Sequence, residues 1–198
     1  KRADTDALHT AFENISTQAT RAQAIMHELR NFVKKESSRK PVNVNELIQN
    51  AIRFLQLEFR ESETELSLSL SDDVPEIEAD QILIEQVLVN LMKNAIEAMQ
   101  ALDKKQRRLT LETHLCHDSG IMVSVHDSGP GINEEETKRI FEPFFTPKPE
   151  GMGMGLAIIR SIIDSHGGEL TLQPNEQGGT TFQFNLPGLP DNQVMNHE

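Results

Sequence analysis

The chain has 198 residues, of which 25% are charged, and a formal net charge of −12. This length suffices for one domain with a full core and a short appendage, and the composition is typical of a soluble globular protein. The negative balance argues against nucleic acid as a partner, because phosphate backbones bind clustered Lys and Arg. Cys116 is the single cysteine, which excludes a disulfide framework or a Cys-based metal site within one chain.

Residues 5–36 are predicted to form one long helix, because apolar side chains recur at spacings of three and four from Leu8 to Val33. An apolar stripe this regular, flanked by polar residues, is typical of a helix that packs in a helical bundle or at a dimer interface. The stretch 36–41 breaks the pattern and is predicted to be a hinge. The chain lacks an initiator Met, so we expect an excised fragment. No apolar run reaches the length of about 18 residues that spans a bilayer.

A compact region is predicted from residue 42 to residue 188, followed by a disordered polar tail at 191–198. We expect helices at 43–61, 80–101, 134–141 and 154–166, and strands at 65–71, 77–79, 108–116, 120–126, 169–173 and 180–186. Helices and strands interleave, but the last strands are joined by turns. We therefore predict an α+β fold, an α/β sandwich in which helices cover one face of a single mixed sheet, preceded by the long N-terminal helix.

Two asparagines lie on the predicted helix 80–101. Asn90 and Asn94 are four residues apart and share one face of an otherwise apolar helix. A buried amide needs a hydrogen-bonding partner, and its oxygen is a suitable ligand for a Mg²⁺ ion that also holds phosphate oxygens. The two residues could instead cap neighbouring backbone groups, and the pair by itself leaves both interpretations open.

A carboxylate and two glycines follow the predicted strand 120–126. Asp127, at the strand end, could accept a hydrogen bond from an exocyclic amino group, and Gly129 and Gly131 would let the backbone approach a flat ring. A plain turn explains the same residues. Farther along, two glycines precede Thr180, whose hydroxyl could reach a phosphate or Asp127. A hairpin turn entering an edge strand is the alternative there.

A glycine run leads directly into the predicted helix 154–166. Glycines at a helix N-terminus expose backbone N–H groups at the positive end of the helix dipole, which suits phosphate. Lys148 lies just upstream as a candidate cation. The spacing matches neither the dinucleotide-binding motif nor the P-loop, and a flexible surface loop is the alternative. The glycines are Gly151, Gly153 and Gly155, and the aromatic residues before them are Phe141, Phe144 and Phe145.

The order and spacing of these four blocks resemble, box for box, the motifs of the histidine kinase ATPase domain (HATPase_c). The segments NLMKNAIEAM, FEPFFTPKPEGMGMGLAI and GGTTFQFNLP are most similar to sensor kinases of the oxygen- and dicarboxylate-sensing or nitrogen-regulatory subgroup. The resemblance covers residues 42–187. It implies the Bergerat ATP-binding fold, which this domain shares with the DNA gyrase, ninety-kilodalton heat-shock chaperone and mismatch-repair (GHKL) ATPases.

The resemblance implies ATP and Mg²⁺ as ligands. Asn94 would coordinate the metal with Asn90 near the phosphates, and Lys93 could reach a phosphate as well. Asp127 would bind the adenine amino group, with Thr180 behind it. The other residues implied to line the nucleotide site are Gly129, Gly131, Ile132, Phe141, Phe144, Phe145, Lys148, Gly151, Gly153, Gly155 and Leu156.

The residue four positions before the metal-binding Asn separates branches of this superfamily. The hydrolytic gyrase and chaperone branches have a water-activating Glu there, whereas this chain has Asn90, which cannot take a proton at neutral pH. We therefore expect a protein-histidine kinase that passes the γ-phosphoryl group to a histidine, for relay to an aspartate of a response regulator receiver domain. A hydrolytic ATPase and a non-catalytic module that recruits a response regulator are the alternatives.

The acceptor histidine is expected on an upstream helix absent from this chain. His27 lies in a sequence similar to the family's phosphoacceptor box, but a single helix precedes the ATP domain and His27 is close to its end. In the family the acceptor lies on the first helix of a hairpin. We therefore assign 1–40 to the second hairpin helix and its linker, 41–190 to the catalytic ATP-binding domain, and 191–198 to the tail.

The same resemblance implies a homodimer in the full-length protein, formed through the apolar stripe of residues 5–36. The fragment itself is expected to be cytoplasmic and to make no direct membrane contact, whereas its parent could be an inner-membrane sensor. Without the acceptor histidine, we expect this fragment to bind ATP but not to phosphorylate itself.

Overall fold

The computed structural model describes residues 39–116, 120–147, 153–175 and 178–189. The predicted helix 5–36 and the predicted tail 191–198 lie outside the described residues. The elements in chain order are β1 (Lys40–Val42), α2 (Val44–Phe54), α3 (Gln56–Ser62), β2 (Glu65–Leu70), β3 (Ile77–Ala79), α4 (Gln81–Ala98), the 3-10 turn η1 (Lys104–Gln106), β4 (Arg108–Leu115), β5 (Ile121–Asp127), α5 (Glu134–Arg139), α6 (Gly155–Ser165), β6 (Leu170–Pro174) and β7 (Thr180–Leu186).

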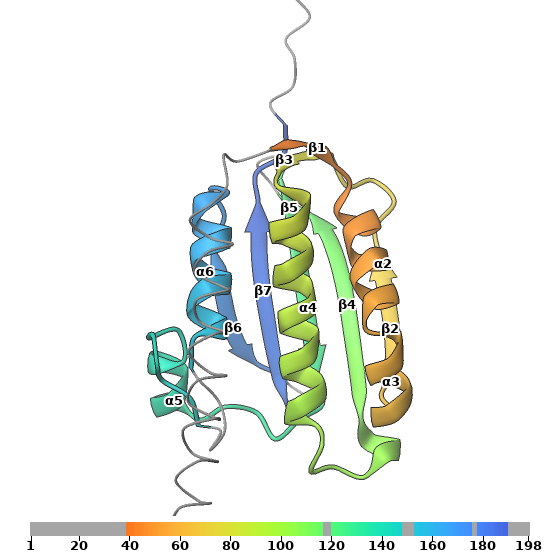
Figure 1. The fold of residues 1–198 in the computed structure, drawn as a ribbon, viewed down its shortest axis with the longest axis vertical. Coiled ribbons are helices and arrows are strands. Elements are labelled where there is room, and N and C mark those ends of the chain that lie inside the picture. The colour runs from red at the N-terminus through yellow and green to blue at the C-terminus, as the bar shows by residue number, and fades with distance from the viewer. Residues whose placement is uncertain (1–38, 117–119, 148–152, 176–177, 190–198) are drawn as a thin grey trace, which may run out of the picture. The chain divides into compact units, whose positions relative to one another are not determined.

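Five strands form one mixed sheet in the order β2-β4-β5-β7-β6 (Figure 1). Strands β2 and β4 are parallel, and the other neighbouring pairs are antiparallel. Helices α2, α4 and α6 lie on one face of this sheet (Figure 1). This arrangement confirms the predicted α+β sandwich with its single helical layer.

Side chains alternate between the two faces of β5, the central strand, and this alternation determines which of them face the helices. Ile121, Val123 and Val125 of β5 are at most 1% exposed, and Val125 lies between Leu111 of β4 and Phe182 of β7. A register shift of one residue would turn this apolar set toward solvent, so burial specifies the register. Asp127 continues the same alternation, and the strand therefore ends with a carboxylate on the helical side of the sheet.

Two elements differ from the sequence predictions. Strand β1 lies at the end of the predicted hinge and pairs antiparallel with β3, placing Lys40 opposite Ala79. Three residues that include a proline carry too little periodicity to be predicted, and proline is tolerated at sheet edges. The predicted helix 43–61 is divided at Leu55, which is completely buried, although neither Gly nor Pro marks the break. Tertiary packing decides both features.

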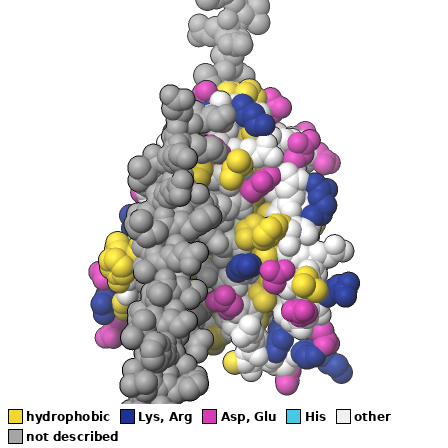
Figure 2. Space-filling model, in the orientation of Figure 1, with side chains coloured by type: hydrophobic (Ala, Val, Ile, Leu, Met, Phe, Trp, Pro, Cys, Tyr) yellow, Lys and Arg dark blue, Asp and Glu magenta, His cyan; other side chains and the backbone are white. Residues whose placement is uncertain are grey.

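Side chains of both charge signs are interspersed on the helical layer in the view of Figure 2. Large apolar side chains of this layer also reach solvent: Phe54 of α2 is 70% exposed, Leu57 of α3 is 56% exposed and Ile82 of α4 is 63% exposed. Within the described ranges, every helix is too short or too polar to cross a bilayer.

Candidate functional site

The helix that carries both asparagines is held in place at its start and along its buried face. Asp80 caps α4, because its Oδ1 accepts hydrogen bonds from the backbone N–H groups of Ile82 at 3.0 Å and Leu83 at 3.3 Å. The buried residues of the helix are all apolar: Ile84, Val87, Leu88, Leu91, Met92, Ala95 and Ile96. This packing determines the directions in which the remaining side chains point.

Asn90 and Asn94 are half-buried on α4, one turn apart. Neither side chain forms a hydrogen bond with another residue of the described ranges. Lys93 directs its ammonium group toward α3, where Nζ lies 3.6 Å from Oε1 of Glu58. The two amides are therefore open to a ligand, whereas the predicted contact of Lys93 with a phosphate would require its ion pair to break.

Asp127 ends β5 with its side chain buried, at 3% exposure. Its Oδ1 accepts hydrogen bonds from the backbone N–H groups of Gly129 at 2.8 Å and Thr180 at 3.3 Å. Thr180 therefore supports the carboxylate through its backbone, whereas the sequence suggested its hydroxyl. Two backbone donors hold the carboxylate in one orientation, so that it presents a fixed acceptor.

Glycines surround Asp127 because side chains would not fit there. A Cβ on Gly129 would lie 2.7 Å from Asp127 Oδ1 and 3.4 Å from the Cβ of Ala98, the last residue of α4. A Cβ on Gly179, whose φ is +99°, would lie 2.0 Å from the Asp127 carbonyl oxygen. Gly131 has a φ of +79°, and a Cβ there would lie 3.3 Å from the Gly179 carbonyl oxygen. The sequence marked Gly179 only as part of the turn before Thr180, and its contact with Asp127 was not predicted because that contact exists only between strands.

The aromatic segment and the glycine run meet at Phe144 and Gly153, and we call this contact the Phe144–Gly153 clasp. The N–H of Phe144 donates a hydrogen bond to the carbonyl of Gly153 at 2.9 Å. The φ values are +69° for Phe144 and +66° for Gly153. A left-handed backbone is strained for phenylalanine, and this ring is 72% exposed, so burial of the ring does not explain the strain.

Two arginines that sequence reasoning missed contact two of the predicted aromatic residues. Arg139 of α5 places its guanidinium carbon 4.3 Å from the centroid of the Phe145 ring. Arg160 of α6 lies 5.4 Å from the centroid of Phe141. Such cation–π contacts contribute about 0.5–1 kcal/mol at exposed sites. No sequence signal marks these pairs, because they form only when α5, α6 and the aromatic segment come together.

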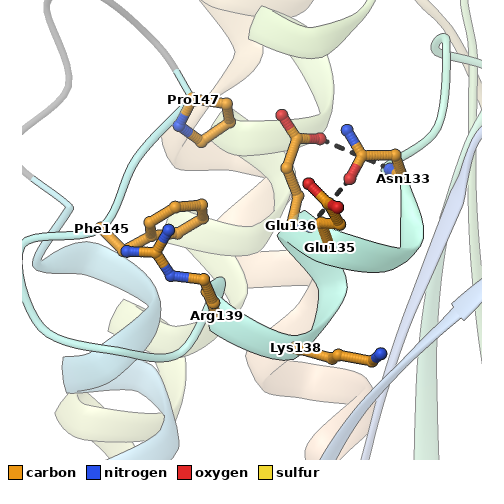
Figure 3. Close-up of a pocket in the computed structure, with 7 residues that line it drawn as sticks. All are labelled: Asn133, Glu135, Glu136, Lys138, Arg139, Phe145 and Pro147. Atoms are coloured by element: carbon orange, nitrogen blue, oxygen red, sulfur yellow. Dashed lines mark hydrogen bonds between the residues drawn. The ribbon is translucent and has the colours of Figure 1, made fainter.

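A pocket of about 540 Å³ lies between α5 and the segment that follows it (Figure 3). Its lining residues are Asn133, Glu135, Glu136, Lys138, Arg139, Phe145 and Pro147. Figure 3 shows the Arg139 guanidinium over the Phe145 ring and Lys138 pointing away from it. Of the predicted site residues, the pocket includes Phe145 and neither Asp127 nor the two asparagines.

Asn133 closes one side of this pocket by capping α5. Its Oδ1 accepts a hydrogen bond from the N–H of Glu136 at 2.8 Å, and Glu136 Oε2 accepts one from the N–H of Asn133 at 3.4 Å. Replacing Asn133 by Ala should destabilise α5 by about 1 kcal/mol. Amide hydrogen exchange should accelerate in α5 and stay unchanged in α4, which serves as the internal control. Equal protection of the α5 amides from exchange in the wild type and in Asn133→Ala would contradict the assignment of Asn133 as the cap of α5.

The remaining predicted residues lie at the start of α6 or against the core. Gly155 begins α6, and its N-cap residue, Met154, makes no side-chain capping bond. The N–H groups of the first turn therefore receive no capping bond from the side chain of the N-cap residue. Leu156 and Ile132 are partly buried and pack against the core. Two further predicted site residues, Lys148 and Gly151, lie outside the described residues.

In the part of the chain that the structure describes, no group of three or more His, Cys, Asp or Glu side chains could hold a metal ion. These residues therefore do not form a metal centre from protein ligands alone. Mg²⁺ differs from transition metals in this respect. It commonly binds through one or two protein oxygens together with waters and substrate phosphates. A half-buried amide such as Asn94 fits that donor set.

Residues 79–190 match the family model described as histidine kinase-, DNA gyrase B-, and HSP90-like ATPase (HATPase_c). The match covers more than half of the chain and includes α4, Asp127 and both glycine-bearing turns. The chain therefore belongs to this family.

The chain is similar to sensor kinases over most of its length. It is 40% identical to sensor protein TdiS of Thauera aromatica over 86% of this chain and 32% of that protein. It is 38% identical to sensor protein FixL of Bradyrhizobium diazoefficiens over 96% of this chain and 37% of that protein. The chain thus spans about a third of the length of these relatives, and it contains the ATP-binding catalytic domain of a sensor histidine kinase.

The chain is also similar to solved structures of histidine kinases. The histidine kinase ThkA in complex with response regulator protein TrrA superposes with a TM-score of 0.72 and 30% identity, over 90% of this chain and 51% of that chain. The catalytic domain of ThkA alone superposes with a TM-score of 0.68 and 35% identity, over 76% of this chain and 95% of that chain.

Proposed function

We propose that the adenine of ATP binds at Asp127, with its amino group donating a hydrogen bond to the carboxylate. The observation that carries this proposal is the buried carboxylate itself, held by the N–H groups of Gly129 and Thr180. Gly129 and Gly179 keep the surrounding backbone free of side chains, which lets a flat base approach. The site would be specific for adenine, because the fixed Asp127 carboxylate accepts a hydrogen bond and therefore selects a base that carries an amino group at this position.

The phosphates lie between α4 and the start of α6 in this proposal. The first-turn N–H groups of α6 receive no capping bond from the side chain of Met154, and they lie at the positive end of the helix dipole. Asn90 and Asn94 supply amide groups from α4, and Asn94 would hold Mg²⁺, which neutralises charge on the phosphates when it is bound. Lys148 and Gly151 complete this phosphate site as predicted from the sequence.

The bound ATP transfers its γ-phosphoryl group to a histidine that lies on an upstream helix outside this chain. Asn90 supports transfer over hydrolysis, because an amide cannot accept a proton from water. Positioning and charge neutralisation then supply most of the catalysis. The phosphohistidine passes its phosphoryl group to an aspartate of a response regulator, and the complex of ThkA with TrrA supports such a partner. We place the domain in the cytoplasm as part of a homodimer.

Replacing Asn94 by Ala tests the metal assignment. Nucleotide affinity should fall roughly tenfold or more with Mg²⁺ present, and much less with EDTA, because the lost ligand acts through the metal. Isothermal titration with ADP under both conditions measures the difference. Gln100→Ala, an exposed amide just beyond the same helix, is the matched control and should bind like the wild type. Equal losses with and without Mg²⁺ would contradict the assignment.

The reaction type is tested by incubating the chain with γ-labelled ATP. Slow phosphate release and an absence of labelled protein are expected, because no acceptor helix is supplied. Turnover at rates typical of enzymes would instead establish a hydrolytic ATPase. Acid-labile, hydroxylamine-sensitive label on His27 would show that the acceptor lies within the chain.

A further inference from the structure

His166 is a buried histidine for which the proposed phosphoryl transfer has no use. It follows the last residue of α6 and is 4% exposed. The sequence shows no metal-ligand spacing around it and predicts only a structural or exposed histidine. In the structure it lies at the end of α6 farthest from Gly155, where the chain of β3 enters α4.

Two hydrogen bonds fix the protonation state of the His166 ring. Nδ1 lies 2.7 Å from the carbonyl oxygen of Ile162, which can only accept. Nε2 lies 3.1 Å from the backbone nitrogen of Asp80, which can only donate. The ring is therefore neutral, with its proton on Nδ1 and a lone pair on Nε2 directed at Asp80. Of the ordinary side chains, few can donate to their own helix and accept from another at the same time.

The bond to Asp80 links the end of one site helix to the beginning of the other. Asp80 supplies the side-chain cap of α4, and its own N–H is satisfied by His166 of α6. The buried side chains of both helices are otherwise apolar. Apolar packing tolerates small axial shifts between helices, whereas a hydrogen bond specifies one axial position.

The backbone around His166 leaves its ring little freedom to move elsewhere. Gly167 follows with a φ of +75°, and a Cβ on Gly168 would lie 2.0 Å from the carbonyl oxygen of Asn185. On the other side, the guanidinium of Arg39 donates a hydrogen bond to the carbonyl of Ser165. The end of α6 is thus held from two directions, and His166 transmits that fixed position to Asp80.

We propose that His166 is a positioning residue for the nucleotide site: its Nε2 sets the axial position of α4 against α6. This role rests on the proposed function, because α4 carries Asn90 and Asn94 while α6 begins at Gly155. A displacement of α4 along its axis would move both amides relative to the first turn of α6. The phosphates could then no longer contact both helices at once.

Two substitutions separate the hydrogen bond from the volume of the ring. His166→Gln keeps an acceptor that can reach the Asp80 N–H, whereas His166→Leu has a comparable apolar volume and no acceptor. In folded protein, His166→Leu should weaken ADP binding in the presence of Mg²⁺ by roughly threefold to tenfold, and His166→Gln by less than about twofold. Affinities equal to the wild type in both variants, or equally weakened in both, would overturn the role of Nε2.

A measurement without nucleotide keeps the proposal independent of ATP binding. Long-range nitrogen–proton correlation spectra of the wild type should show the Nδ1–H tautomer of His166. Amide hydrogen exchange at Asp80 and in the first turn of α4 should be faster in His166→Leu than in His166→Gln. Wild-type protein that fails to bind ADP would refute the proposed function alone. An Nε2–H tautomer would refute the positioning role alone, including when His166→Leu does not fold.

Discussion

Asp127→Asn is expected to lower the affinity for ATP and ADP about a hundredfold while the domain stays folded. The Asn oxygen can still accept from the N–H groups of Gly129 and Thr180, so the turn keeps both bonds. The NH2 group of the Asn side chain then faces the adenine amino group. Because both groups are hydrogen-bond donors, no hydrogen bond forms between them. Losing a hydrogen bond to a charged group costs about 1.5–3 kcal/mol, and the opposed donors add to this loss.

Isothermal titration with ADP and urea denaturation together measure this effect. Asp164→Asn, which removes an exposed carboxylate from α6, is the matched control and should change neither quantity. Asp127→Ala should lose binding and also stability, because the two backbone donors lose their acceptor. Wild-type affinity in folded Asp127→Asn would exclude Asp127 as the adenine ligand.

Gly153→Ala is expected to open the Phe144–Gly153 clasp and to reduce nucleotide affinity about tenfold or more. Its Cβ would lie 2.5 Å from backbone atoms of Phe144 and Phe145, and backbone cannot move aside as a flexible side chain can. The φ of +66° adds a cost for any residue with a side chain, and together these effects should cost about 1–3 kcal/mol.

Gly155→Ala is the matched control from the same glycine run. Among the described residues, no atom apart from its chain neighbours and the backbone of its own helix lies within 4 Å of the position its Cβ would take, and the residue begins α6. Alanine should therefore preserve affinity, and its higher helix propensity should raise stability by up to about 0.5–1 kcal/mol. Calorimetry and denaturation of both variants decide the outcome. Equal losses in the two variants would show that the whole run serves the phosphates and that the clasp has no separate role.

Several site features follow local rules and were predicted from the sequence. Asp80 caps α4 at the predicted start of the helix, because capping depends on residues two and three positions away. The spacing of Asn90 and Asn94 places both on one face for the same local reason. The roles of these asparagines and of Asp127 in binding ATP stay predictions, which the variants above test.

Other features depend on segments that meet only in the folded chain. The break at Leu55, the strand β1 and the contact of Arg160 with Phe141 have no local signal. The close contact of Gly179 with the carbonyl of Asp127 was not predicted because it lies across neighbouring strands. In each case the decisive atoms belong to another element, and spacing along the chain does not reveal them.

Apart from β1 and the break between α2 and α3, the sequence by itself determined the order of the helices and strands, the sandwich they form and the family to which the motifs belong, because periodicity, caps and glycine spacing act within a few residues. The tertiary structure alone decided how those motifs are held. It turned the Thr180 backbone toward Asp127, joined Phe144 to Gly153, and aimed the lone pair of His166 at α4. These contacts are directional and join distant segments, so they exist only once packing has brought the partners together.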